Sequence, residues 1–342
     1  MEPITHLAAG LLTAQALRPR LGAPRGLTSL CAVAATIPDL DVLAGWLGPE
    51  FYLLHHRGLT HSLAALPLLA LLLAWTARRL GAGLTLRAGF LAAGMALAGH
   101  LFLDVVTAFG TQLFAPFSDA RLSLEGIFII DPLFTASLLA LAFLARSGSG
   151  RNPERRARLA LAGLGWMLLY PALCIGLRAD ITARYEKRLA RQGQVYDRVV
   201  VTPDALAPFY WKVVLESGPD MLVTTANPLD IAADYPVLRL KRADRDELRR
   251  LGRQASIFGT FAWFAEFPYA EAAPAPDGAQ AIRYADASFL NSGPVLRALY
   301  GDGAVFAELT AVLDAAGRLT SWRDERGQTH PVAHPALPGG GL

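Results

Sequence analysis

Long apolar runs alternate with short polar segments through the first half of the chain, and this alternation stops near residue 178. A helix needs about 20 residues to cross a bilayer core of about 30 Å. The fourth, fifth and sixth runs fit that length, whereas the first and third are short. The pattern predicts six membrane segments, with five or a re-entrant first segment as the alternative: Ile4–Leu17, Leu27–Leu47, Leu63–Ala77, Ala88–Phe109, Ile127–Ala145 and Leu159–Leu177.

The second half has the pattern of a water-facing domain, in which short strand-like runs are separated by turns. A helix is predicted at Ala243–Gln254, and Gly317 predicts a hairpin between Val305–Asp314 and Arg318–Trp322. Five further strands are predicted at Val195–Thr202, Phe209–Leu215, Met221–Thr225, Tyr235–Leu240 and Ala281–Phe289. The fold class is therefore mostly α, with a polytopic helical membrane domain at 1–177. A small α+β extramembrane domain with an antiparallel sheet follows at 178–342 and ends in a flexible Pro/Gly-rich tail.

The composition agrees with this division. Hydrophobic residues make up 53% of the chain and charged residues 18%, against roughly 25% in an average soluble domain. These values exclude a disordered chain and disfavour an ordinary cytosolic enzyme. The two cysteines, Cys31 and Cys174, lie inside apolar runs, so they predict neither a disulfide framework nor a cysteine metal site.

Arginine placement predicts the orientation, because cytoplasmic loops of membrane proteins are enriched in Lys and Arg. Alternate loops hold eleven arginines: Arg18, Arg20, Arg25, Arg78, Arg79, Arg87, Arg146, Arg151, Arg155, Arg156 and Arg158. The N-terminus, the 48–62 and 110–126 loops and the C-terminal domain are then predicted to face outward from an inner membrane. The basic stretch at 178–192 follows the last predicted crossing, so we expect it near lipid headgroups and expect no nucleic-acid partner.

Ionisable residues inside apolar segments are costly and often functional. The predicted topology gathers nearly all of them at the outward face: His6, Asp39, Asp41, His55, His56, His61, His100, Asp104 and Asp131. Histidine and carboxylate clusters suit first-row divalent ions, and the absence of cysteine ligands favours a catalytic site over a structural one. The i,i+4 spacing of His100 and Asp104 puts both on one helix face.

Each of these residues also has a simpler interpretation. His100 and Asp104 could be a polar packing pair, and the Pro38–Asp41 segment could be a helix-end turn. Arg57 could bind phosphate, neutralise a carboxylate or anchor to lipid headgroups. Asp131 before Pro132 fits a helix cap. Only one of His55 and His56 is expected to face the site, because they are neighbours in one loop.

Four motifs carry a resemblance to a known family: Thr5-His6, Pro38–Asp41, the His56–Ser62 stretch and Gly99–Asp104. Together they resemble bacterial inner-membrane metal-dependent hydrolases, some described as LexA-binding, over roughly residues 1–145. The LexA association is not carried over, because the predicted inner loops are short. The order of His6, Asp41, His56 or His61, and His100 with Asp104 is also distantly similar to zinc-dependent phospholipase C and P1-type nuclease. Those enzymes have further His and Glu ligands, but after Asp104 no His occurs here before His330, and Glu125 and Asp131 are the nearby candidates. The resemblance therefore implies one or two ions rather than three.

The leading hypothesis is a membrane-embedded metal-dependent hydrolase, phosphoesterase-like, with its site at the outer face. The predicted metal ligands are His6, Asp41, His56, His61, His100 and Asp104, and zinc is preferred to manganese. Asp39 or Asp131 is predicted to act as general base, and Arg57 to stabilise phosphate charge. The predicted partner is a membrane lipid or lipid-linked phosphoester.

Two other function classes are weighed against it. The first is a non-enzymatic membrane anchor or binding protein with a structural metal site. The second is a metal or proton transporter, which is disfavoured because transport needs polar residues along the whole membrane depth and here they gather at one end. The sequence does not identify the oligomeric state.

Overall fold

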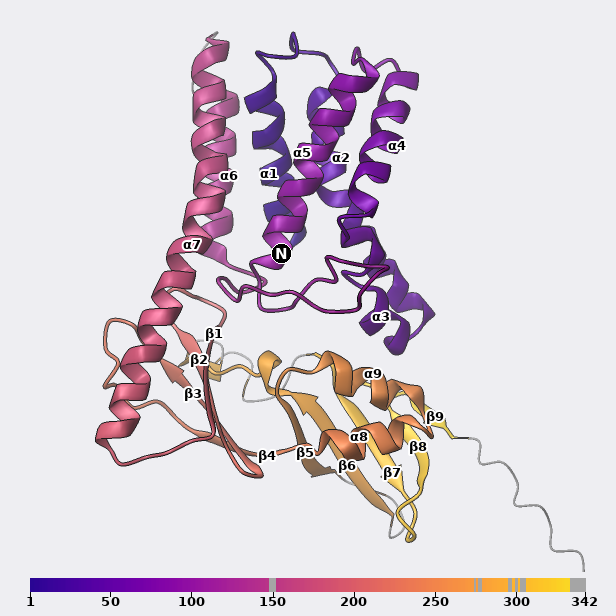
Figure 1. Ribbon diagram of the computed structural model, residues 1–342, viewed down its shortest axis with the longest axis vertical. Coiled ribbons are helices and arrows are strands. Elements are labelled where there is room, and N and C mark those ends of the chain that lie inside the picture. The colour runs from indigo at the N-terminus through magenta and orange to yellow at the C-terminus, as the bar shows by residue number, and fades with distance from the viewer. Residues whose placement is uncertain are drawn as a thin grey trace, which may run out of the picture.

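A computed structural model of the chain describes residues 1–147, 152–273, 275, 279–294, 297–298, 301 and 306–332. Val305 and the predicted tail at 335–341 lie outside this range. The N-terminal half is a bundle of helices, and a β-sheet domain lies beyond one end of it (Figure 1). The helical elements are α1 Pro3–Leu17, α2 Leu27–Thr36, η1 Ile37–Leu47, α3 Pro49–His55, η2 Leu59–His61, α4 Ala65–Arg79, α5 Leu86–Val105, α6 Pro132–Ser147 and α7 Pro153–Arg191.

Three helical segments in the described part are long and apolar enough to cross a membrane: Leu27–Leu47, Leu86–Val105 and Pro153–Arg191. A fourth arises if Pro49–His61 and Ala65–Arg79, which meet at a bend of 69°, form one broken span. Apolar helices are therefore present as predicted, and the count of six spans stays a prediction.

Helix α1 has only 15 residues, fewer than a membrane crossing needs. Its neighbours enclose it, since most of its residues are buried. Small residues let these neighbours approach closely, as is typical of helices packed in membranes. A Cβ added at Gly10 would lie 2.6 Å from the Cys31 carbonyl oxygen, and one at Gly163 would lie 2.7 Å from Leu12. The position of α1 at the centre of the bundle places His6 among the other helices.

Helical structure is interrupted at the end of the bundle where the N-terminus lies: α2 passes into η1, and Pro49–His61 meets Ala65–Arg79 at the 69° bend (Figure 1). Helix α2 continues after Thr36 as the 3₁₀ segment η1, which has Pro38 in its first turn. Proline lacks a backbone N–H and disfavours a continuous α-helix. Irregular backbone within a membrane is tolerated where protein buries it or where it lines a polar cavity, so this end of the bundle is where a polar site is expected.

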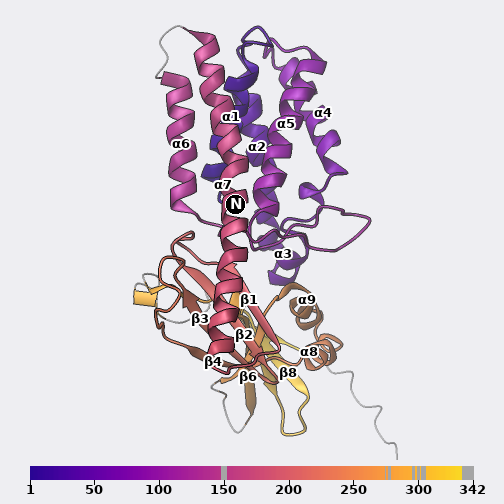
Figure 2. The same ribbon diagram turned by 60° about the vertical axis from the view of Figure 1, so that its left-hand side comes forward.

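Helix α7 connects the two regions. It has 39 residues, which corresponds to about 58 Å, and runs from the bundle along the sheet domain (Figure 2). Arg178 Nε donates to the carbonyl of Val201 in β1 at 2.7 Å, and Arg178 also pairs with Glu125 at 2.6 Å. Burial raises the pKa of Glu125, while Arg178 opposes that rise. The basic residue thus ties the helix to the sheet and to the segment between α5 and α6.

The sheet domain is an antiparallel meander, in which the nine strands of the described residues follow one another in chain order. Helices α8 Arg245–Gly252 and α9 Ser256–Phe264 share an apolar core with its later strands. The predicted hairpin is confirmed by the pairing of β7 with β8. The strands are β1 Arg198–Pro203, β2 Trp211–Ser217, β3 Asp220–Ala226, β4 Leu238–Arg242, β5 Pro268–Ala273, β6 Gln280–Asp286, β7 Leu309–Leu313, β8 Leu319–Arg323 and β9 Thr329–Pro331.

Side chains from α3 and from the segment between α5 and α6 dock the sheet domain onto the bundle. Glu50 accepts hydrogen bonds from Ser256 at 2.7 Å and Thr260 at 3.0 Å, both on α9. Arg121 donates to the Phe264 carbonyl at 2.6 Å and lies over the Phe264 ring. Burial lowers the pKa of Arg121 to about 10, so its guanidinium remains charged at neutral pH. These contacts hold the domain beside the broken end of the bundle.

Candidate metal centre

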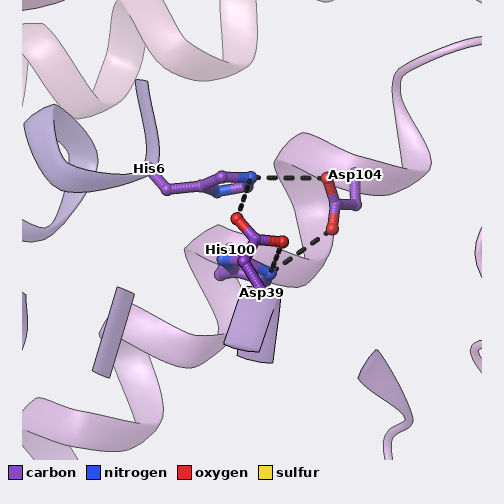
Figure 3. A group of neighbouring side chains, drawn as sticks. All are labelled: His6, Asp39, His100 and Asp104. Atoms are coloured by element: carbon purple, nitrogen blue, oxygen red, sulfur yellow. Dashed lines mark ion pairs between the residues drawn. The ribbon is translucent and has the colours of Figure 1, made fainter. Parts of the chain in front are cut away.

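Two histidines and two carboxylates converge at the broken end of the bundle: His6 from α1, Asp39 from η1, and His100 and Asp104 from α5 (Figure 3). One ligand atom from each lies within 4.8 Å of the others. The side chains of His6, His100 and Asp104 have no exposed surface, and that of Asp39 is 17% exposed. Buried ionisable groups are costly unless paired or bound to a metal, so this cluster requires a compensating charge.

The spacing fits a divalent ion. His6 Nε2 is 3.7 Å from Asp39 Oδ2 and 3.4 Å from Asp104 Oδ1. His100 Nε2 is 3.6 Å from Asp39 Oδ1 and 3.3 Å from Asp104 Oδ2. Bonds of about 2.0–2.2 Å to a tetrahedral zinc separate neighbouring ligands by about 3.3–3.6 Å.

Several atoms that point into the cluster have no hydrogen-bond partner in the described structure: Nε2 of His6, Oδ2 of Asp39, Nε2 of His100 and Oδ2 of Asp104. Buried polar atoms without partners are rare and call for an explanation such as a bound ion. Oxygen and imidazole nitrogen are the ligands that zinc and manganese accept. The donor set and the missing partners therefore fit a divalent metal.

A backbone carbonyl prepares His100 for this role. The Nδ1 of His100 lies 2.8 Å from the carbonyl oxygen of Ala35, near the end of α2. A carbonyl only accepts, so Nδ1 carries the proton and Nε2 keeps its lone pair toward the cluster. Metal-binding histidines commonly donate their other ring N–H in this way.

His61 stands beside the four residues and is oriented by Asp41. His61 Nε2 is 3.1 Å from Asp104 Oδ2 and 3.4 Å from Asp39 Oδ1. Its other nitrogen, Nδ1, lies 3.0 Å from Asp41 Oδ2. This arrangement matches the carboxylate–histidine–metal pattern, in which an outer carboxylate fixes the ring and its tautomer. His61 thus contacts two members of the cluster, Asp39 and Asp104, without belonging to the group of four.

The structure gives Asp39 and Asp41 different places from those that the sequence suggests. Asp39, predicted as a base, belongs to the cluster, whereas Asp41, predicted as a ligand, lies outside it. Residues two apart lie on different faces of a helical segment such as η1, so Asp39 and Asp41 do not face the same side. Asp41 accepts from the Arg57 backbone N–H and the Thr60 hydroxyl, both at 2.9 Å.

His56, also predicted as a ligand, faces Asp41 rather than the cluster. Its Nδ1 is 2.7 Å from Asp41 Oδ1, and its ring stacks on Tyr52 with centroids 4.8 Å apart. His55 is exposed and packs against Phe51, so of the two neighbours only His56 faces the site. His56 and Asp41 together form an outer layer around His61.

Arg57 supplies the positive charge that the two carboxylates need. It is 3% exposed, and its Nη2 is 3.0 Å from Asp104 Oδ1, while Nη1 donates to Thr107 Oγ1 at 2.8 Å. The N-terminal amino group of Met1 also contacts Asp104 Oδ1. Of the alternatives for Arg57, neutralisation of a carboxylate is the one that this geometry supports. Its φ of 57° is uncommon for a residue with a side chain, and such strain often occurs at functional sites.

Asp131, predicted as an alternative base, lies away from the cluster. Its Oδ1 accepts from the Phe134 backbone N–H at 2.9 Å, which caps α6, and its Oδ2 accepts from the Tyr170 hydroxyl at 2.9 Å. Both carboxylate oxygens are therefore occupied by the capping interaction that the sequence also allowed.

The exposed edge of the cluster lies on η1. Asp39 is the partly exposed member, and nearby residues of η1 expose apolar side chains: Leu40 is 59% and Val42 49% exposed. The surface beside this carboxylate is therefore apolar, which suits a molecule that has an apolar part and a polar or charged part.

A family model, described as the YdjM inner membrane protein, matches residues 1–181, which include every residue of the cluster. The chain belongs to the YdjM family. Together with the apolar helices, this membership makes it an inner-membrane protein. The curated "Uncharacterized protein YfhP" of Bacillus subtilis (strain 168) is 26% identical over 156 residues, which are 44% of this chain and 48% of that protein. The chain thus matches about half the length of that relative, and no solved structure matches it.

The YdjM description names no activity, so the similarity to metal-dependent hydrolases and to phospholipase C stays a prediction. Several residues around the cluster were not predicted: the Ala35 carbonyl, Thr60, Thr107 and the Met1 amino group. Backbone groups and single hydroxyls carry no sequence signal of their own. Thr60 is the exception, because its place inside the His56–Ser62 motif is a sequence signal.

Proposed function

We propose that this protein is a membrane-embedded, metal-dependent hydrolase that acts on a phosphoester of a lipid or lipid-linked molecule. The observation that carries the proposal is the convergence of His6, Asp39, His100 and Asp104, whose inward atoms lack hydrogen-bond partners in the described structure. A metal held by histidines and carboxylates without cysteine is typical of hydrolytic sites.

The residues divide into three roles in this proposal. His6, His100 and Asp104 hold the metal, and His61 adds a donor whose direction is set by Asp41. When bound there, a divalent ion supplies Lewis acidity toward a phosphoryl oxygen and toward the attacking water. Arg57 balances the charge of Asp104, so that two buried carboxylates can remain ionised around one ion.

Asp39 is the residue best placed to accept a proton. It is the partly exposed member of the cluster, and its Oδ2 has no hydrogen-bond partner among the described residues. Asp131 is excluded from this role in the proposal because both of its oxygens are engaged. Asp39 thus combines ligation through one oxygen with proton acceptance through the other.

The proposed orientation of the protein in the membrane rests on the positions of its arginines. The arginine-bearing connections lie at the opposite end of the bundle from the cluster (Figure 1), and the positive-inside rule would make that opposite end cytoplasmic. The cluster and the sheet domain would then face the periplasm or exterior. A lipid-borne substrate is proposed because the surface of η1 beside Asp39 exposes apolar side chains.

The test is hydrolysis by purified protein loaded with zinc or manganese. We would incubate wild type and the Asp39→Asn variant with a phospholipid and with a polyprenyl phosphate, and measure released phosphate or phosphorylated headgroup. We expect turnover by wild type and a loss of at least 100-fold in the variant, since general base catalysis contributes about 10²–10⁴-fold. A metal-loaded wild type that cleaves neither substrate would contradict the proposal and leave the metal centre standing.

A second candidate function is a non-enzymatic membrane anchor with a structural metal. The observation that favours it is that the donors come from three elements, α1, η1 and α5, which one ion would clip together. This candidate predicts that chelation lowers the melting temperature sharply and that no substrate is turned over. Intact folding after chelation, with loss of hydrolysis, would contradict it.

A further inference from the structure

A cavity of about 670 Å³ lies where η1 and α3 face α9 and the last strands of the sheet domain. This volume falls within the range of about 300–1,000 Å³ that is typical of small-molecule sites. Neither the metal cluster nor the proposed chemistry explains a cavity of this size.

The wall formed by η1 is apolar and continues onto the outer surface of the bundle. Val42, Trp46 and Leu47 line it, and they are 49%, 84% and 72% exposed. Phe261 and Phe306 complete this wall from the sheet domain. Tryptophan is enriched where membrane proteins meet the lipid–water interface. An apolar chain could therefore pass from the lipid phase into the cavity along η1.

A second wall, formed by the residue before β7, the turn between β8 and β9, and β9, is polar and carries both signs of charge. Glu308, Glu325, Arg326 and His330 line it. His330 is paired with Asp324 at 3.1 Å, and Glu325 accepts from the Ala307 backbone N–H at 3.1 Å. Arg326 has no ion-pair partner within the described residues. A headgroup with a phosphate and an amine complements a cation and a carboxylate set side by side.

The side chains of Tyr52, His56 and Asp41 lie between the cavity and the metal centre. Tyr52 lines the cavity and stacks on His56, whose Nδ1 contacts Asp41 at 2.7 Å. Val42, on the apolar wall, is the next residue after Asp41. A molecule in the cavity would therefore lie beside the outer layer of the metal centre.

We propose that this cavity binds a phospholipid-type amphiphile with a zwitterionic headgroup. Its apolar chain lies along Val42 and Trp46, and its phosphate and amine meet Arg326 and Glu325. This binding site is separate from the metal centre and does not depend on the proposed function.

The test measures binding to chelator-treated protein, so that hydrolysis plays no part. The full-length chain in detergent is titrated with lysophosphatidylethanolamine, a single-chain zwitterionic probe, and with lysophosphatidylglycerol, an anionic one, and bound lipid is counted by native mass spectrometry. We expect saturable binding of one zwitterionic lipid, at least tenfold tighter than the anionic lipid.

Two neighbouring substitutions provide a matched comparison. Val42→Trp fills the cavity and is expected to weaken zwitterionic binding at least tenfold. Leu43→Trp adds the same bulk at a residue that is 45% exposed but does not line the cavity, and is expected to bind like wild type. Arg326→Gln, on an exposed side chain, is expected to remove the preference between the two probes without affecting the fold.

Equal binding by Val42→Trp and Leu43→Trp would overturn the proposed location. Equal affinity of wild type for both probes would overturn the proposed headgroup. Retained lipid binding by a protein that hydrolyses nothing would leave this site intact and count only against the proposed function.

Discussion

Asp41→Asn separates an orienting role from direct ligation. Asp41 contacts His61 Nδ1 at 3.0 Å and accepts hydrogen bonds from Arg57 N–H and the Thr60 hydroxyl, but is not part of the cluster. The amide keeps the shape and loses the charge that fixes the imidazole. Loss of such an outer partner reduces metal affinity by about 10–100-fold. At about 1.4 kcal/mol per tenfold, this corresponds to about 1.4–2.8 kcal/mol of binding free energy.

The assay is competition between the protein and a chelator of known zinc affinity, monitored for wild type and Asp41→Asn. Asp131→Asn is the control, because Asp131 is also a buried carboxylate at this end but contacts Tyr170 and the start of α6. An affinity unchanged in Asp41→Asn would refute the orienting role. Complete loss of metal would instead make Asp41 a direct ligand, and an equal loss in Asp131→Asn would show that the effect is not local.

Three further predictions concern stability. In metal-free protein, Arg57→Met removes a buried partner of Asp104. We expect the free energy of unfolding to fall by about 3–5 kcal/mol, seen as a lower urea midpoint than for wild type. Gly10→Val forces a side chain against the Cys31 carbonyl and should cost about 1–3 kcal/mol, whereas Gly165→Val, with open space around it, should leave the melting temperature near that of wild type. Burial acts to raise the pKa of Asp324, but hydrogen bonds from His330 and two backbone N–H groups outweigh it and lower the pKa overall. A carboxylate whose pKa is lower in the folded state stabilises the fold at pH values above its unfolded-state pKa, and this stabilisation is lost as the pH falls. The melting temperature of wild type should therefore fall further than that of Asp324→Asn between about pH 5 and 2. Equal falls in melting temperature for the two proteins would contradict this role of Asp324.

The sequence was sufficient to predict which residues come together, but not which groups each of them contacts. The i,i+4 spacing is sufficient to put His100 and Asp104 on one helix face, and the structure has them together in the cluster. Which of Asp39 and Asp41 faces the cluster depends on how η1 is rotated against α1 and α5. A proline predicts the end of regular helix there, but not a 3₁₀ segment of 11 residues.

The sheet domain shows a similar limit. Alternating apolar residues predicted strands near β1 to β4 and β6 to β8, whereas β5 begins at Pro268 and β9 has only three residues. Short strands that begin or end in proline carry a weak pattern. Helix α9 was missed because its many aromatic residues are also typical of strands. The cavity could not be predicted at all, since its walls come from segments more than 200 residues apart.

Metal content is the decisive measurement for the cluster of His6, Asp39, His100 and Asp104. Wild type and the His100→Ala/Asp104→Ala variant would be purified in detergent without chelators and analysed by elemental mass spectrometry. We expect about one equivalent of zinc or manganese in wild type and its loss in the variant, with both proteins showing the same helical circular dichroism. A well-folded wild type that holds no metal, or a variant that retains it in full, would show that these residues do not form a metal site.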